Sequence, residues 1–192
     1  KIGLNAIFNG NGFIHDGSYY YGKIINYPDN PESYHDYKFK DTFNRIEKGI
    51  ARFEYNSEIS GSALKELKSF LEECRARKIY VIGFLPPFAH VVFEKMNKMK
   101  EKFGYLCKLE PAIKNVFDDF GYKFFDFSDM QAVNSADAEA IDGFHGSEKT
   151  YLRIFIKMIE NDKMLKKYSD INYLKNRLNK SKSNFIVFEI NE

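Results

Sequence analysis

Residues 79–85 read Ile-Tyr-Val-Ile-Gly-Phe-Leu, a continuous apolar run that stops at Pro86-Pro87. A short apolar run without polar alternation indicates a strand that is covered on both faces, as in a parallel sheet. The run Tyr122-Lys-Phe-Phe-Asp-Phe127 predicts another strand, and residues 1–8 and 184–190 predict strands near the two ends. Helices are expected between these strands, over residues 38–53, 62–78, 89–102, 105–120, 147–160 and 162–179.

The alternation of helices and strands predicts a layered α/β fold with a largely parallel sheet. No internal repeat or clean linker divides the sequence, so a single α/β domain over residues 1–192 is the simplest organisation. Within it, residues 1–60 are expected to form an irregular N-terminal part and residues 61–160 the core. Residues 161–192 would add a C-terminal helix and strand.

Composition bounds the possible functions. The chain has 192 residues, enough to bury a core, and 44% of them are hydrophobic. Its 29 Lys and Arg against 27 Asp and Glu give a net charge of +2, which argues against a duplex-DNA binder with a broad basic face. No apolar run approaches the roughly 18 residues that a membrane-spanning helix needs. Two cysteines are too few for a disulfide scaffold or a thiolate zinc site, and neither a metal nor another cofactor is expected.

The polar motif with the clearest chemistry is Asp142-Gly-Phe-His145, which follows the strand at 122–127 and a polar loop. In α/β sheets, functional groups gather beyond the carboxyl ends of the strands. An Asp three residues before a His can lie on the same side of a tight turn and hold the imidazole in one tautomer. The other ring nitrogen then accepts a proton from a nucleophile. The alternative interpretation is an Asp-Gly turn that carries a surface histidine.

A family resemblance adds to this interpretation. The block Asp142-Gly-Phe-His145-Gly-Ser147, the helix expected after it, and the upstream strand ending in Pro86-Pro87 together resemble the carboxyl-terminal half of an SGNH (GDSL-like) hydrolase. The resemblance covers residues 60–160 and implies a flavodoxin-like, three-layer α/β/α fold. It also implies hydrolysis or transfer of acyl esters through a Ser nucleophile without a metal. By this resemblance, His145 would be the general base and Asp142 its orienting partner.

The nucleophile of such enzymes sits in an early Gly-Asp-Ser block, which this sequence lacks. The closest string is His15-Asp-Gly-Ser18, so Ser18 is either a nucleophile or part of a turn. The oxyanion Asn of the family would lie near Asn56, which lacks the expected neighbouring Gly and is either a donor or a loop residue.

The chain begins at Lys1, directly on an apolar run, which leads us to expect that an upstream part of the protein was removed. That N-terminal part would then be a partner of this chain and would carry the nucleophile. The same part would also carry any targeting segment, so the sequence does not distinguish a cytoplasmic from a periplasmic or cell-surface location.

Two further features have both a functional and a structural interpretation. His90 opens a helix near the proposed site and is either a substrate-binding residue or a helix-start histidine. Residues 163–182 form a basic segment that either meets an anionic polysaccharide, a membrane surface or RNA, or is a solvated helix face. Its cations are Lys163, Lys166, Lys167, Lys175, Arg177, Lys180 and Lys182.

The leading hypothesis is an SGNH-like acyl-ester hydrolase or O-acyltransferase that acts on a small-molecule, carbohydrate or surface-polymer ester. The alternative is a non-catalytic carbohydrate-binding or assembly domain on the same scaffold. In that case the aromatic residues Tyr19–Tyr21 and Tyr34–Tyr37 would stack on sugar rings.

Overall fold

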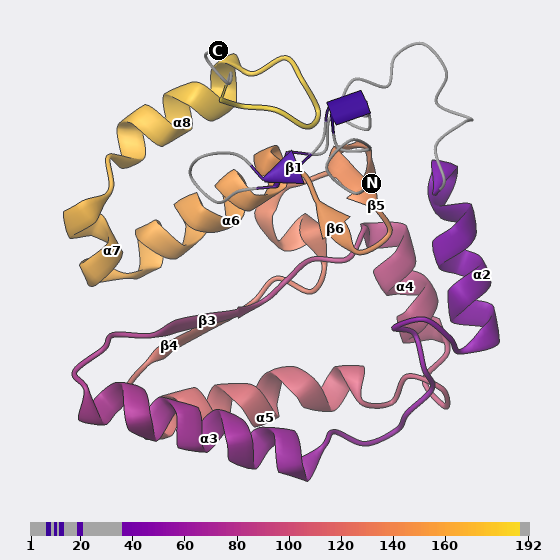
Figure 1. Ribbon diagram of the computed structural model, residues 1–192, viewed down its shortest axis with the longest axis horizontal. Coiled ribbons are helices and arrows are strands. Elements are labelled where there is room, and N and C mark those ends of the chain that lie inside the picture. The colour runs from indigo at the N-terminus through magenta and orange to yellow at the C-terminus, as the bar shows by residue number, and fades with distance from the viewer. Residues whose placement is uncertain (1–6, 9, 11, 14–18, 21–35, 189–192) are drawn as a thin grey trace.

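The computed structural model of the chain describes residues 7–8, 10, 12–13, 19–20 and 36–188 (Figure 1). Over these residues the protein is mixed α/β, as the sequence predicts, with more helix than strand. The predicted strand at 1–8 lies mostly outside the described residues. Its last two members, Ile7 and Phe8, are helical and largely exposed, so the strand prediction is wrong there.

A parallel pair of strands forms the centre of the fold. The strands β3 (Ile82–Leu85) and β4 (Lys123–Asp126) pair with Ile82 opposite Lys123 and Leu85 opposite Asp126. The parallel direction continues beyond the strand ends in an isolated bridge between Phe88 and Asp129. Both strands predicted from apolar runs are therefore present and parallel, and their carboxyl ends lead into neighbouring loops.

Helices lie on both faces of this pair (Figure 1). On one side, α3 (Gly61–Ala76) and α5 (Leu106–Asp119) pack through Leu71 and Phe117 against Phe124 of β4. On the other side, α6 (Glu148–Asn161) packs through Ile154 and Met158 against Ile82 and Phe125. The described residues thus place helices above and below a short parallel sheet.

The other α-helices within residues 36–188 are α2 (Lys40–Lys48), α4 (His90–Lys98), α7 (Lys163–Tyr168) and α8 (Ile171–Lys180). Side-chain N-caps start four of the helices, because an oxygen there accepts an otherwise unpaired backbone N–H. The capping residues of α3, α6, α7 and α8 are Ser60, Ser147, Asp162 and Asp170. Two antiparallel pairs complete the strands: β1 (Gly12–Phe13) with β2 (Tyr19–Tyr20), and β5 (Ala140–Asp142) with β6 (His145–Gly146).

Several element boundaries differ from the sequence predictions: α4 ends at Lys98 and not at residue 102, β3 begins at Ile82 and not at residue 79, and three further differences have a clear local cause. The helix predicted over 38–53 ends at Lys48, because Gly49 takes a left-handed conformation with φ of 64° and stops it. The helix predicted over 162–179 is interrupted at Ser169, where the backbone is extended and Asp170 starts a new helix. The strand predicted over 184–190 is irregular from 184 to 188, and the rest lies outside the described residues.

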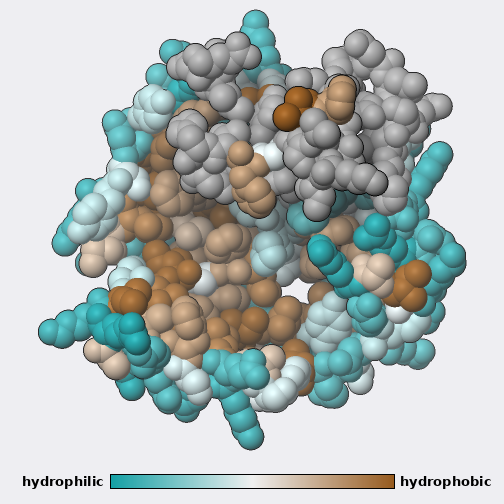
Figure 2. All heavy atoms as spheres, in the orientation of Figure 1, coloured by the Kyte–Doolittle hydropathy of each residue, from teal (hydrophilic) through white to brown (hydrophobic). Residues whose placement is uncertain are grey.

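The two-stranded sheet leaves apolar side chains partly uncovered. Phe84 of β3 is 36% exposed and Phe155 of α6 is 37% exposed. Figure 2 shows a broad apolar area on the face over this part of the fold, bordered by hydrophilic side chains. The sequence predicted a strand covered on both faces, and the described residues cover it only in part. Among the helices described here, none has the length and hydropathy to span a membrane.

Tyr80 links the residues before β3 to the start of α7. Its hydroxyl donates a 2.6 Å hydrogen bond to Oδ2 of Asp162. Desolvation and this bond to a carboxylate raise the pKa of Tyr80 to about 12. Burial favours the protonated form of Asp162, but hydrogen bonds from Tyr80 and from the N–H groups of Leu165 and Met164 outweigh it and lower the pKa of this carboxyl.

The hydrogen bond between Tyr80 and Asp162 should make the free energy of unfolding depend on pH in the alkaline range. A tyrosine whose pKa is raised by folding stabilises the protein fully below its unfolded pKa and loses that contribution as the pH rises through the folded value. The free energy of unfolding should therefore fall between pH 10 and about pH 12, and Tyr80→Phe should reduce the slope of this fall. Urea denaturation across this range would measure it, with the exposed Tyr168→Phe as control. Equal slopes in the wild type and Tyr80→Phe would contradict the assignment.

Candidate active site

A short β-hairpin carries the Asp-Gly-Phe-His motif. Asp142 ends β5 and His145 begins β6, and the two residues face each other as a cross-strand pair around Gly143 and Phe144. Ser147 follows directly as the N-cap of α6 and accepts a hydrogen bond from the N–H of Thr150. The sequence therefore turns sharply between a strand end and a helix start, which positions both functional side chains on one side of the hairpin.

The imidazole and the carboxylate are in direct contact. Nδ1 of His145 lies 2.7 Å from Oδ2 of Asp142, and Oδ1 of Asp142 accepts a 2.9 Å hydrogen bond from the N–H of Phe144. The contact expected from the sequence is thus present. With Nδ1 donating to the carboxylate, Nε2 of His145 is the nitrogen that accepts a proton from another group. The His145 side chain is 38% exposed and that of Asp142 is 18% exposed, so the imidazole is accessible while its partner is mostly shielded.

A buried carboxylate at Asp36 fixes the turn of this hairpin. Its Oδ2 accepts hydrogen bonds from the Thr42 hydroxyl at 2.6 Å and the Gly143 N–H at 3.0 Å, and its Oδ1 accepts one from the Thr42 N–H at 2.9 Å. Asp36 is 5% exposed and Thr42 is 1% exposed. A Cβ on Gly143 would lie 2.4 Å from the Thr42 side chain, so only glycine allows this approach. Sequence analysis missed Asp36, since 107 residues separate it from Gly143.

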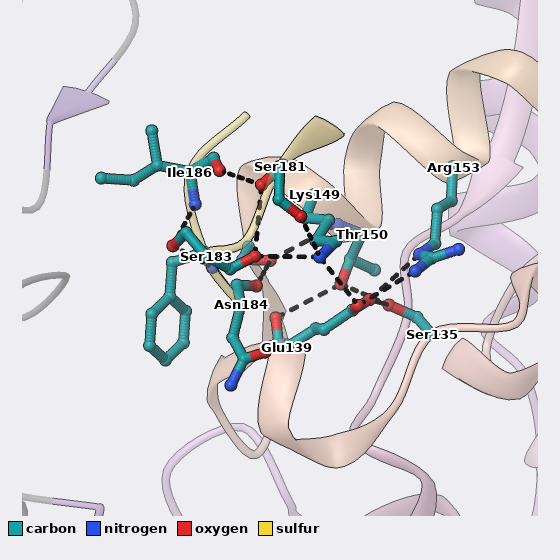
Figure 3. Close-up of polar contacts among 11 residues, drawn as sticks. Ser135, Glu139, Lys149, Thr150, Arg153, Ser181, Ser183, Asn184 and Ile186 are labelled. Atoms are coloured by element: carbon teal, nitrogen blue, oxygen red, sulfur yellow. Dashed lines mark hydrogen bonds and ion pairs between the residues drawn. The ribbon is translucent and has the colours of Figure 1, made fainter. Parts of the chain in front are cut away.

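Glu139 anchors the other end of the hairpin (Figure 3). Its carboxylate accepts two hydrogen bonds from the Arg153 guanidinium, at 3.0 and 3.1 Å, and one from the Ser135 hydroxyl. Its backbone carbonyl accepts hydrogen bonds from the Ser147 N–H and the Thr150 hydroxyl. These contacts join the residue before β5 to the first turns of α6, so the hairpin is held at both ends by buried polar groups.

His90 forms a second imidazole–carboxylate pair. Its Nδ1 lies 2.9 Å from Oδ2 of Asp129, and its backbone N–H donates a 2.6 Å hydrogen bond to Asp137. The preceding N–H, of Ala89, donates to the carbonyl of Gly143 at 3.1 Å. His90 therefore starts α4, as predicted, and its helix start is bonded directly to the turn between Asp142 and His145.

Phe144 borders the His145 imidazole, with the two ring centroids 4.3 Å apart. The Phe53 ring packs edge-on against the Phe144 ring, with a centroid distance of 5.7 Å. The guanidinium groups of Arg45 and Arg52 lie 6.0 and 5.6 Å from the centre of the Phe144 ring. The surroundings of the pair therefore combine an aromatic surface with positive charge.

The structure does not bring Asn56 to the histidine–aspartate pair. Asn56 is exposed, its side-chain oxygen accepts a hydrogen bond from the N–H of Glu58, and its own N–H donates to the carbonyl of Lys102 at 2.8 Å. These contacts are those of a loop residue, the structural alternative given by the sequence. Ser18, the candidate nucleophile, lies outside the described residues.

The part of the chain that the structure describes contains no group of three or more His, Cys, Asp and Glu side chains that could hold a metal ion. No protein-family model, curated protein or solved structure matches the chain.

Proposed function

We propose that the protein is an SGNH-type acyl-ester hydrolase or O-acyltransferase in which His145 is the general base and Asp142 orients it. The observation that carries the proposal is the 2.7 Å contact between Nδ1 of His145 and the shielded carboxylate of Asp142. A carboxylate in this position fixes the tautomer of the imidazole and stabilises the imidazolium that forms during the reaction. The partial exposure of the His145 side chain makes its imidazole accessible to a nucleophile and a substrate.

The proposed reaction uses this pair as follows. Nε2 of His145 takes the proton of a serine hydroxyl while the serine oxygen attacks the carbonyl carbon of the ester. This attack gives a tetrahedral intermediate. The imidazolium returns the proton to the leaving alcohol as the carbon–oxygen bond breaks and an acyl-serine remains. Water or an acceptor hydroxyl, deprotonated by the same imidazole, then attacks the acyl-serine and forms a second tetrahedral intermediate. Its collapse breaks the bond between the acyl carbon and the serine oxygen, which takes back the proton from the imidazolium, so that the acid or the new ester leaves and the serine is restored.

The nucleophile is assigned to a serine outside residues 36–188. Within that range, Asp142 is the only hydrogen-bond partner of His145. Two nearby serines have other partners: the Ser128 hydroxyl donates to Asp126, and that of Ser147 donates to the carbonyl of Asn184. Ser18 remains the candidate that this sequence offers.

The three-layer, flavodoxin-like architecture is part of the same proposal. Helices on both faces of a parallel pair support it, as does the apolar area left exposed beside that pair (Figure 2). A parallel sheet is stable when both of its faces are covered, and two strands alone are marginal. The architecture would require further strands from outside residues 36–188.

A carbohydrate or surface-polymer acyl ester is the proposed substrate. The Phe144 ring beside the imidazole offers an apolar surface for a small acyl group, and Arg52 adds positive charge above that ring. These features fit an ester on a polar or anionic saccharide better than a long-chain lipid ester, which would need a larger apolar channel.

Covalent labelling tests the proposal most directly. The complete native protein is incubated with a serine-reactive fluorophosphonate probe and with p-nitrophenyl acetate, and the modified residue is located by mass spectrometry. We expect a single modified serine and ester turnover, with both lost in His145→Gln and retained in Asp118→Asn, which removes an exposed carboxylate on α5. Labelling that persists in His145→Gln would refute the assigned base. A complete absence of labelling and turnover would favour the non-catalytic carbohydrate-binding alternative.

A further inference from the structure

The segment after α8 folds back onto the start of α6 (Figure 3). The N–H of Lys149 donates to the carbonyl of Phe185, and the Ser147 hydroxyl donates to that of Asn184 at 3.0 Å. In return, the Glu148 carboxylate accepts a 2.6 Å hydrogen bond from the N–H of Val187. The segment therefore has a defined conformation beside the helix that follows His145.

A cavity of about 470 Å³ lies between the end of α8 and this segment. It is lined by three cationic side chains, two serines and two aliphatic residues, and no carboxylate is among them. The lining residues are Arg177, Lys180, Ser181, Lys182, Ser183, Ile186 and Val187. A concave site lined by cations without acidic partners attracts an anion.

Arg177 provides an independent indication of a missing partner. One of its terminal nitrogens donates to the carbonyl of Val187 at 3.0 Å, and the guanidinium carbon lies 5.5 Å from the centre of the Phe188 ring. Its Nε is buried and has no hydrogen-bond acceptor, and it is the only such buried side-chain atom in the described residues. Buried charged donors in folded proteins nearly always have an acceptor, so the unpaired Nε leaves the charge of the Arg177 guanidinium incompletely satisfied within the described residues.

Ser183 adds a neutral donor to the lining. Its oxygen accepts hydrogen bonds from the N–H groups of Phe185, at 3.0 Å, and Ile186, at 3.1 Å. The hydroxyl proton remains available for a further acceptor, because a serine hydroxyl accepts with its lone pairs and donates with its one hydrogen. The lining thus offers guanidinium, ammonium and hydroxyl donors at one place.

We propose that this cavity binds a phosphate group. The three positive charges of Arg177, Lys180 and Lys182 match a dianion better than a single carboxylate, and guanidinium groups suit the tetrahedral arrangement of phosphate oxygens. Phosphate oxygens would accept hydrogen bonds from the Arg177 guanidinium, which lines the cavity. The group could belong to free inorganic phosphate or to a phosphorylated saccharide, and this site does not depend on the esterase proposal.

Calorimetric titration of the full chain with inorganic phosphate, at constant ionic strength adjusted with chloride, tests the site. We expect saturable binding that Lys180→Gln/Lys182→Gln weakens by about tenfold or more, because charged hydrogen-bond partners are lost. Lys167→Gln on α7, which removes an equivalent exposed charge away from the cavity, should bind as the wild type does. Thermal unfolding of each variant with and without phosphate checks that the variants are folded and gives a second measure of binding.

A hexose phosphate in the same titration separates the two sources. Tighter binding of the hexose phosphate than of inorganic phosphate would support a saccharide ligand, and equal or weaker binding would support the free ion. The proposal is overturned if phosphate shows no saturable binding, or if Lys167→Gln weakens binding as much as the cavity variant does. It is also overturned if only a short RNA or anionic vesicles bind and inorganic phosphate does not.

Discussion

Asp142→Asn is expected to lower kcat for ester turnover by about 10²–10⁴-fold, with a much smaller change in KM. The amide cannot carry the negative charge that stabilises the imidazolium. In addition, its NH₂ group can face Nδ1 and reverse the tautomer, so that Nε2 carries the proton when it should accept one. Hydrolysis of p-nitrophenyl acetate by the full chain, measured from pH 5 to 9, provides kcat and its pH dependence.

The control for this prediction is Asp118→Asn, whose carboxylate pairs with Lys114 on the exposed face of α5. It should leave kcat within about twofold of the wild type, because an exposed ion pair contributes little. Combining Asp142→Asn with His145→Ala should cost little more than His145→Ala alone, since residues that act as a unit have non-additive effects. Fully additive losses would show that the two side chains act separately and would contradict the proposed mechanism.

The sequence predictions that the structure contains are those set by local patterns. The apolar run before Pro86-Pro87 is enough to predict the parallel strand β3, although the described residues cover its side chains only in part. The contact between Asp142 and His145 follows from a spacing of three residues across a tight turn. In both cases the sequence signal lies within a few residues along the chain, although β3 itself pairs with the distant strand β4.

Interactions between distant segments could not be predicted in the same way. His90 was a candidate from its place after β3, but its partner Asp129 is 39 residues away and follows a different strand. Asp36 was missed altogether, since only the folded chain brings it to Gly143. The strand predicted near the C-terminus is absent from residues 184–188 for a related reason. The Val187 side chain is buried against Leu152 and Ile156 of α6, so it packs on a helix and not within a sheet.

Asp36→Ala is expected to lower the free energy of unfolding by about 3–5 kcal/mol. The substitution removes the carboxylate that accepts three hydrogen bonds. Three buried donors then lack an acceptor: the N–H and the hydroxyl of Thr42, and the N–H of Gly143. Urea denaturation followed by circular dichroism measures the loss. Asp118→Ala, which removes an exposed carboxylate of the same type, should cost less than about 1 kcal/mol.

The conservative variant Asp36→Asn distinguishes the loss of these hydrogen bonds from the loss of the whole side chain. Its side-chain oxygen still accepts one or two of the three hydrogen bonds, so it should recover part of the stability lost in Asp36→Ala. Because the Gly143 N–H lies in the turn between Asp142 and His145, Asp36→Asn should also lower kcat while the protein remains folded. If both Asp36 variants were as stable as Asp118→Ala, the buried carboxylate would not be what holds the hairpin in place.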